Sequence, residues 1–443
     1  MTNCYRLHWL CLVQLSLLLI SCHKPRPTQS AQDRTRLVNT AHLDHLYQVV
    51  QLNGVAVGLI NIYSEYPDYT WVADDDEGAA CVDDVARAVL FLLHEPDLKV
   101  NAGKQDKLHK LTEFVLQMQA NTPDAGGGYF YNFIFGNRVI NKTGSTSINQ
   151  PNWWSWRALW CLTEVYPYYK TVDPAFALRL QTASQRLVAN IIRDFGSKPQ
   201  AYNQVAGLNI PTWLPYGSGS DQAAIMILGL LNYYQQTPDP QVLNVMTKLG
   251  DGIVQMQQGG TRQVPYGAIL SFENNWHAYG SDQAYALLRA GKALNRPNWL
   301  AVARREVDQF YPYLLKEGFL ESFTIDKKGQ DLSFIKKSRF SQIAYGVRPM
   351  VWAALELYDQ TQNARYLKLA GQLASWFLGS NPAKALMYDK TTGMAFDGIR
   401  SDSTINKNSG AESTIESLLA FQRLEQYPAA VTQATNSRSL WPK

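Results

Sequence analysis

Six strongly apolar segments recur along the chain at intervals of about 60 to 70 residues, and each opens with a polar or cap-forming residue. They begin near the following positions: Asp83, Trp153, Asp221, Asp282, Gln342 and Glu412. Each segment is apolar around most of its circumference, which predicts a helix that is buried on nearly every side. Recurrence at a nearly fixed interval indicates a repeated supersecondary unit.

A second set of predicted helices alternates with the first and is apolar on one face only. Its segments are 43–50, 108–118, 173–195, 239–258, 297–316 and 364–379. This alternation predicts an all-α (α/α)6 barrel, in which an inner ring of helices is enclosed by an outer ring. An open solenoid needs polar units at its ends, whereas the first and last buried segments here are as apolar as the middle ones. We therefore expect a closed ring in which the helices beginning at Asp83 and Glu412 are neighbours.

The connections between these helices are of two kinds. Links that follow a buried helix are short turns, and links that precede one are long and rich in aromatic residues. In a closed barrel the long links emerge together at the end where the inner helices begin, and long loops on a compact scaffold commonly carry function. Rings with a polar tip suit the faces and hydroxyl groups of sugars. The aromatic candidates for substrate binding are Trp71, Trp153, Trp154, Tyr216, Trp276, Tyr279 and Tyr345.

Carboxylates gather at the same end and suggest a chemistry. Glycosidic hydrolysis uses two carboxyl groups, one protonating the leaving oxygen and the other activating water or attacking the sugar, with roughly 6.5–9.5 Å between them for inversion. We expect Glu412 to be the acid, because burial among tryptophans raises the pKa of a carboxyl group. Asp83 or Asp84 is the candidate base, and Arg87, one turn further, is placed to pair with either.

Other polar residues at this end are candidate substrate contacts. They are Arg87, Asp221, Glu273, His277 and Asp282. Asp221 and Asp282 each follow Gly-Ser, so capping of a helix N-terminus explains them equally well.

The segment 376–382 (Trp-Phe-Leu-Gly-Ser-Asn-Pro), followed by Met387-Tyr388, resembles the Leu-Gly-x-Asn-Pro segment near the end of family 9 glycoside hydrolases. The resemblance implies an (α/α)6 barrel whose base comes from an Asp-rich motif near the N-terminus and whose acid is a glutamate just before the last inner helix. Asp83-Asp84 and Glu412 occupy these places in chain order. The Asp-Ala-Gly-Asp, His-His-Arg and Asn-Glu motifs of that family are absent, so the chain resembles the wider six-hairpin glycosidase superfamily and is only remotely similar to family 9.

Three functions remain open at this point: a glycoside hydrolase, a polysaccharide lyase or epimerase on the same barrel, and a surface lipoprotein that binds glycan without cutting it. His277, with Glu273 and Tyr279, is the candidate proton-transfer group of a lyase. The sequence contains no His-Glu-x-x-His, Gly-x-Ser-x-Gly or zinc-spaced Cys pair, which disfavours a serine triad or a multi-His metal site. The oxygen ligands of the run 74–77 (Asp-Asp-Asp-Glu) would suit Ca²⁺. Acidic runs of this kind are more often solvated loops than calcium sites, so we expect no cofactor.

The N-terminus predicts export to the bacterial cell envelope. Residues 1–22 contain one charged residue, an apolar run and the lipobox Leu-Ile-Ser-Cys. Cys22 is the predicted lipidation site, and its lipid is the only predicted attachment to the membrane. We expect a polar tether over 23–36, a single barrel domain over 37–430 and a C-terminal tail over 431–443. The net charge of +4 is too small to indicate nucleic-acid binding. We expect a monomer with Cys81 and Cys161 as core thiols.

Overall fold

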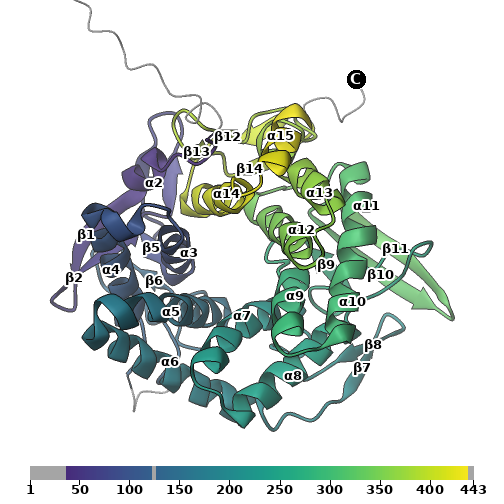
Figure 1. Cartoon of the computed structure of the whole chain (residues 1–443), viewed down its shortest axis with the longest axis horizontal. Helices are drawn as coiled ribbons and strands as arrows, with labels where there is room; N and C mark the ends of the chain where they lie inside the picture. The colour runs from purple at the N-terminus through teal and green to yellow at the C-terminus, as the bar shows by residue number, and fades with distance from the viewer. Residues whose placement is uncertain (1–35, 122–125, 438–443) are drawn as a thin grey trace, which may run out of the picture. The chain divides into compact units, whose positions relative to one another are not determined.

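The computed structural model describes residues 36–121 and 126–437. The predicted signal peptide, its lipidation site Cys22 and residues 23–35 of the predicted tether lie outside the described residues, as do residues 438–443 of the predicted tail. From Leu37 onward the chain forms one unit, shown in Figure 1. Within the described part of the chain, no helix combines the length and the apolar character needed to cross a bilayer.

Six of the described helices form an inner ring (Figure 1). They are α3 (Val82–Leu93), α5 (Trp153–Val172), α7 (Ser220–Gln236), α9 (Gln283–Ala293), α12 (Arg348–Thr361) and α14 (Ala411–Leu424). Each packs against the next, and α14 packs against α3, which closes the ring. Arg87 of α3 bonds Glu412 of α14 across 325 positions of sequence, so the predicted contact between the first and last inner helices is confirmed.

An outer element follows each inner helix after a short turn. These elements are α4 (Ala102–Gln117), α6 (Pro174–Phe195), α8 (Pro240–Gln255), the continuous run of α10 (Pro297–Arg305), η2 (Glu306–Phe310) and α11 (Tyr311–Glu317), then α13 (Arg365–Ala374) and α15 (Pro428–Asn436). The turns before α6 and α8 have the same design, an aspartate followed by proline. Asp173 and Asp239 accept bonds from backbone N–H groups of the first turn, and proline supplies a φ angle already suited to a helix start.

The prediction of a first outer helix over 43–50 was wrong. Helix α2 (Ala41–Leu46) is followed directly by a hairpin of β1 (Tyr47–Leu52) and β2 (Val55–Ile60). The turn residues Asn53 and Gly54 have φ angles of 52° and 79°, as a two-residue hairpin turn requires. Valines on both sides of this turn favour strands because branching at Cβ suits the pleated sheet.

The outer partner of α14 is α15, which continues past Ala430, where we expected the C-terminal tail to begin. Ala430 and Ala434 are fully buried. Helix α13 approaches so closely that a Cβ atom added to Gly371 would lie 2.5 Å from the carbonyl oxygen of Ala430. Residues 431–436 therefore belong to the barrel.

Most of the long links contain short antiparallel hairpins rather than irregular loops, and the remaining strand pairings join links to one another. The strands are β3 (Tyr63–Glu65), β4 (Thr70–Val72), β5 (Ala80–Cys81), β6 (Phe133–Ile134), β7 (Tyr202–Val205), β8 (Leu208–Pro211), β9 (Asn275–His277), β10 (Ser322–Lys328), β11 (Asp331–Ser338), β12 (Tyr388–Asp389), β13 (Met394–Ala395), β14 (Gly398–Ser401) and β15 (Thr404–Asn406). The pairs are β3–β4, β5–β6, β7–β8, β9–β10–β11, β12–β13 and β14–β15.

The core lies between the two rings of helices and within the inner ring. Helices α5 and α7 meet at Gly229, where an added Cβ atom would lie 2.8 Å from the backbone nitrogen of Trp160. Glycine is needed there because the two backbones leave no room for a side chain. Cys81 and Cys161 are buried free thiols, as predicted. Cys81 is the N-cap residue of α3, and its sulfur accepts a bond from the backbone N–H of Asp84 at 3.5 Å.

Candidate active site at the N-terminal end of the inner helices

A cavity of about 320 Å³ lies at the end of the barrel where the inner helices begin. Its walls come from the first turns of α3, α5 and α14 and from the long links. The lining residues are Glu77, Asp83, Arg87, Asn132, Phe133, Thr146, Trp153, Trp154, Arg157, Tyr279, Ile343, Tyr345 and Glu412. Seven of them were candidate site residues from the sequence: Asp83, Arg87, Trp153, Trp154, Tyr279, Tyr345 and Glu412.

Glu412 stands in the first turn of α14 and faces the cavity. The two terminal nitrogens of Arg87 each donate to its Oε2 at 3.2 Å, and 41% of its side chain remains exposed. Burial raises the pKa of Glu412 to about 7, although Arg87 acts in the opposite direction; the nearby carboxylates of Asp84 and Glu416 raise the pKa further. A carboxyl group with this pKa is partly protonated near neutral pH, as a general acid must be.

The adjacent aspartates Asp83 and Asp84 differ in their environments. Asp83 lines the cavity and is paired through Oδ1 with Arg157 at 2.5 Å; its Oδ2 accepts a bond from the Asn132 amide at 3.3 Å. Asp84 is 5% exposed and pairs with Arg87 at 3.0 Å, behind the cavity wall. Burial raises the pKa of Asp84, and Arg87 opposes that rise. Asp83 therefore faces the cavity, whereas Asp84 is paired with Arg87 behind its wall.

A buried chain of ion pairs fixes Arg87 from its other side. The Nε of Arg87 lies 3.3 Å from Oε1 of Glu416, whose Oε2 lies 2.6 Å from Nε of Arg348. Arg348 in turn binds both oxygens of Asp282, at 2.5 and 3.1 Å. The side chains of Glu416 and Asp282 are fully buried. Buried charges persist only when each is paired, so this chain of pairs sets the position of the guanidinium group that binds Glu412.

Tyr345 forms a wall between two arginines. The guanidinium carbons of Arg87 and Arg157 lie 4.6 and 5.1 Å from the centre of its ring, and Arg157 donates a hydrogen bond to its hydroxyl group. Arg157 also lies 5.1 Å from the ring of Trp153. The neighbouring Trp154 is held by a 2.7 Å bond from its indole nitrogen to the carbonyl of Phe130. The aromatic walls of the cavity are therefore rigid.

His277 and Asp221 support the cavity from outside its lining. The Nε2 of His277 lies 3.1 Å from Oδ2 of Asp221, and its Nδ1 lies 2.9 Å from the carbonyl oxygen of Tyr279. The rings of His277 and Tyr279 stack with centroids 3.7 Å apart. Both ring nitrogens of His277 are thus engaged within the protein, and the pair orients Tyr279 toward the cavity.

The remaining candidates do not line this cavity. Asp282 is enclosed behind Arg348, as described above. Trp276 is 1% exposed and stacks on Phe323 with centroids 5.2 Å apart, so it belongs to the core. Trp71 and Tyr216 are 42% and 55% exposed, on the links that precede α3 and α7. Glu273 lies in a turn, and its backbone N–H donates at 2.9 Å to the hydroxyl of Ser218 on the preceding link.

Sequence reasoning missed Arg157 as a site residue. The sequence feature that could have identified Arg157 is that it is the single charged residue in the run Trp153-Trp-Ser-Trp-Arg-Ala-Leu-Trp160. Arginine is almost never fully buried unless it is paired, so its position in that helix required an acidic partner nearby. Arg348, at the start of α12, carried the same signal.

The acidic run 74–77 forms a turn beside the cavity. Asp74 Oδ1 accepts bonds from the backbone N–H groups of Asp76 and Glu77, both at 2.8 Å. Glu77 lines the cavity and accepts a 2.7 Å bond from the hydroxyl of Tyr63. No group of three or more His, Cys, Asp or Glu side chains is arranged to hold a metal ion among residues 36–121 and 126–437.

Comparison with solved structures finds similar barrel folds. The fold is similar to those of a sugar epimerase from a ruminal bacterium (TM-score 0.56, 10% identity) and the cellobiose 2-epimerase of Bacillus thermoamylovorans (TM-score 0.55, 10% identity). Each match covers 83% of this chain and 92% of the other chain. A family 76 glycoside hydrolase from a bovine Bacteroides thetaiotaomicron strain matches over 88% of this chain and 79% of its own (TM-score 0.52, 13% identity). No family model and no curated protein matches the sequence. The predicted (α/α)6 barrel is confirmed as a fold.

Proposed function

We propose that the protein is a carbohydrate-active enzyme, specifically a glycoside hydrolase that cleaves a poly- or oligosaccharide with Glu412 as acid and Asp83 as base. One observation carries the proposal. A carboxyl group with a pKa of about 7 and a second, ion-paired carboxylate line one aromatic-walled cavity. Two carboxyl groups in different electrostatic environments are the pattern of an acid and base pair.

The reaction follows from these placements. A sugar ring rests against Trp153 and Trp154, and Glu412 donates its proton to the glycosidic oxygen as the bond to the anomeric carbon breaks. Asp83 takes a proton from a water molecule, whose oxygen attacks the anomeric carbon from the opposite face. The products are a free alcohol and a hemiacetal. Arg87 stabilises the Glu412 carboxylate that remains, and the proton on Asp83 returns to solvent and then to Glu412.

We propose inversion of the anomeric configuration. The two carboxyl groups belong to different helices and are bound by different arginines, Arg157 for Asp83 and Arg87 for Glu412. We assign the pair to the wider spacing of inverting enzymes, roughly 6.5–9.5 Å, which leaves room for a water molecule, rather than to the spacing of about 5–5.5 Å that direct attack needs. Proton NMR of the first product formed identifies its anomer and tests this part of the proposal.

Epimerisation of a free sugar is the second candidate, because three of the solved structures with a similar fold are named as epimerases. Proton transfer at carbon next to a carbonyl needs a base within hydrogen-bond reach. Both ring nitrogens of His277 are occupied by Asp221 and Tyr279, and none of the described residues lining the cavity is a histidine. These contacts favour hydrolysis.

The test is release of reducing ends from a panel of neutral and acidic polysaccharides, with glycan binding measured in parallel. Four variants accompany the parent: Glu412→Gln, Asp83→Asn, the adjacent Asp84→Asn, and Asp331→Asn at an exposed hairpin position as a matched control. We expect the first two to bind glycan while losing activity about 10²–10⁴-fold, and the control to match the parent. Equal glycan binding by all proteins with no cleavage makes the protein a binding lipoprotein instead, and conversion without new reducing ends makes it an epimerase.

We also propose that the chain is anchored in the bacterial cell envelope by a lipid on Cys22. The support is the sequence alone: an apolar run ending in Leu-Ile-Ser-Cys22. Metabolic labelling with an alkyne fatty acid tests it. We expect label and membrane fractionation in the parent and neither in Cys22→Ser; label retained in Cys22→Ser contradicts the proposal.

A further inference from the structure

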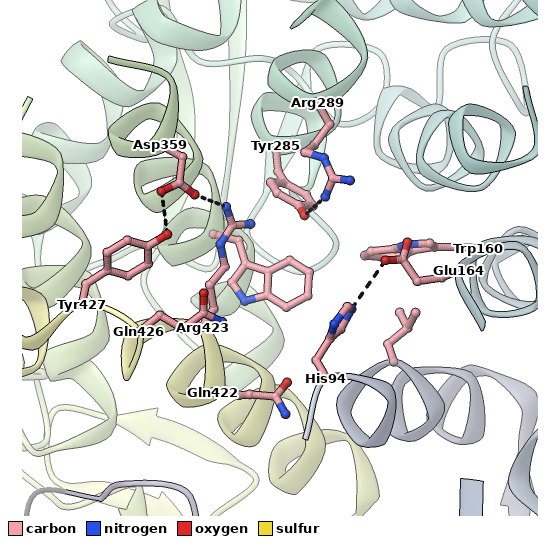
Figure 2. A pocket seen from close by; sticks show the side chains of 12 residues that line it. His94, Trp160, Glu164, Tyr285, Arg289, Asp359, Gln422, Arg423, Gln426 and Tyr427 are labelled. Atoms are coloured by element: carbon pink, nitrogen blue, oxygen red, sulfur yellow. Dashed lines mark hydrogen bonds and ion pairs between the residues drawn. The ribbon is translucent and has the colours of Figure 1, made fainter. Parts of the chain in front are cut away.

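A second cavity, of about 330 Å³, lies at the opposite end of the inner ring (Figure 2). Its residues come from the C-terminal parts of α3 and α14, from α5, α9 and α12, and from the turn after α14. It shares no lining residue with the cavity that contains Glu412. Its volume falls at the lower end of the range of small-molecule sites, roughly 300–1,000 Å³.

Aromatic rings form one part of its wall. Trp352 meets Trp160 edge to face with centroids 6.2 Å apart, and it meets Tyr285 with centroids 5.2 Å apart. The indole nitrogen of Trp352 donates to the carbonyl oxygen of Leu419 at 3.1 Å, which fixes the orientation of the ring. A platform that is already ordered binds the apolar face of a ligand with little loss of entropy.

The polar side of the cavity begins with His94 and Glu164, which point toward each other in Figure 2. His94 Nε2 lies 3.5 Å from Oε1 of Glu164, and Oε2 of Glu164 accepts a 2.5 Å bond from the amide of Asn232. Burial raises the pKa of Glu164, but the bonds from His94 and Asn232 and the charge of Arg289 outweigh it, so the net direction is downward. Glu164 is therefore an ionised acceptor at the cavity wall.

Two arginines supply donors on the other side. Arg423 Nη2 lies 3.2 Å from Oδ2 of Asp359, and the hydroxyl of Tyr427 donates to Oδ1 of Asp359 at 2.6 Å, as Figure 2 shows. Arg289 donates to the hydroxyl of Tyr285 at 2.7 Å. Most of the donors of Arg289 remain for a ligand, because each guanidinium group carries five N–H bonds.

The charges of the residues lining this cavity balance. The lining contains two carboxylates, Glu164 and Asp359, and two guanidinium groups, Arg289 and Arg423. Behind the lining, Arg423 also pairs with Glu356 at 2.7 Å, so the surroundings do not attract an anion, whereas a neutral molecule with many hydroxyl groups finds both donors and acceptors beside an aromatic face. We propose that this cavity is a second binding site, which takes one neutral pyranose ring, either a free monosaccharide or the end of a glycan chain. The site does not depend on the catalytic proposal.

Saturation-transfer NMR on the purified full chain tests the site. The probes are glucose, mannose and galactose, their methyl glycosides, cello-oligosaccharides, and glucuronate as the anionic comparison. Measurements in the Glu412→Gln background prevent turnover. We expect at least one neutral probe to bind, with affinity lowered at least tenfold by Glu164→Ala and by Asp359→Ala and unchanged by Trp153→Ala in the catalytic cavity. Binding of free sugars alone indicates a monosaccharide site, and binding of oligosaccharides that Glu164→Ala weakens and Trp153→Ala does not indicates capture of a chain end.

Each contrary result overturns the proposal. These results are no binding of any neutral probe, loss of binding in Trp153→Ala but not in Glu164→Ala, or tighter binding of glucuronate than of glucose. Glu164→Ala removes a partly buried acceptor and risks misfolding, so a second variant acts from the surface. Gln426 is exposed at the cavity mouth, and Gln426→Trp should block binding while circular dichroism shows the parent fold. Undiminished binding in that variant also contradicts the site.

Discussion

The substitution Glu412→Gln should stabilise the protein above neutral pH while it abolishes activity. Burial raises the pKa of Glu412 to about 7, whereas an unfolded glutamate titrates near 4.3. The folded state therefore binds this proton more tightly than the unfolded state. Its contribution to stability is complete below pH 4 and is lost as the pH rises through about 7. Glutamine remains neutral throughout and avoids that loss.

The magnitude follows from the difference between the two pKa values. At 1.36 kcal/mol for each pH unit, a difference of between two and three units corresponds to about 3–4 kcal/mol as an upper bound. Because 41% of the side chain is exposed, water screens part of this cost, and about 1–2 kcal/mol is the expected gain for Glu412→Gln at pH 8. At pH 4 the protonated acid and the amide are nearly equivalent, so the two proteins should have similar stability.

Urea unfolding at pH 4 and pH 8, followed by far-ultraviolet circular dichroism and tryptophan fluorescence together, measures the effect. Asp331→Asn at an exposed position is the matched control and should show no such pH-dependent difference. If Glu412→Gln is no more stable than the parent at pH 8, or if it is more stable by the same amount at both pH values, then folding does not raise the pKa of Glu412 and the reasoning fails.

Three further predictions follow from the same network. The kcat/KM of the parent should fall about tenfold per pH unit above pH 7, because only protonated Glu412 can donate its proton; a profile that stays flat to pH 9 contradicts this role. Arg348→Met should lower the free energy of unfolding by about 3–5 kcal/mol, since it leaves Asp282 buried without its arginine and Glu416 with Arg87 alone. Arg348→Lys should lose less, and equal losses would argue against charge as the cause. Trp153→Ala should raise KM about tenfold with a smaller change in kcat, as loss of a stacking surface worth about 1.4 kcal/mol; an unchanged KM would place the sugar elsewhere.

The architecture could be predicted because the burial of a helix can be recognised from the pattern of apolar residues in its sequence. A helix surrounded by protein is apolar on all sides, and six such helices at regular spacing leave few arrangements other than a ring. The error over 47–50 arose because Val49 and Val50 fit a helical face as well as a strand. The Asn53-Gly54 turn between valine-rich runs was the signal that distinguished the two.

The site could be predicted only in part, for a geometric reason. Neighbouring residues on a helix point about 100° apart, so only one of Asp83 and Asp84 can face the cavity. Packing of α3 against α5 and α14 decides which one does, and no local pattern contains that information. Arg157 and Arg348 were missed because their partners come from other helices, Asp83 from α3 and Asp282 with Glu416 from the N-cap of α9 and from α14.

The measurement that tests the central claim most directly is mass spectrometry of products formed in ¹⁸O-labelled water from an oligosaccharide that the parent converts. Hydrolysis adds one water molecule per bond broken and places one labelled oxygen on the new reducing end. We predict this product from the parent and its loss in Glu412→Gln and Asp83→Asn at unchanged substrate binding. A product with unchanged mass, as in epimerisation, or an unsaturated product without added water, as in elimination, would contradict the assignment of Glu412 and Asp83 as a hydrolytic pair.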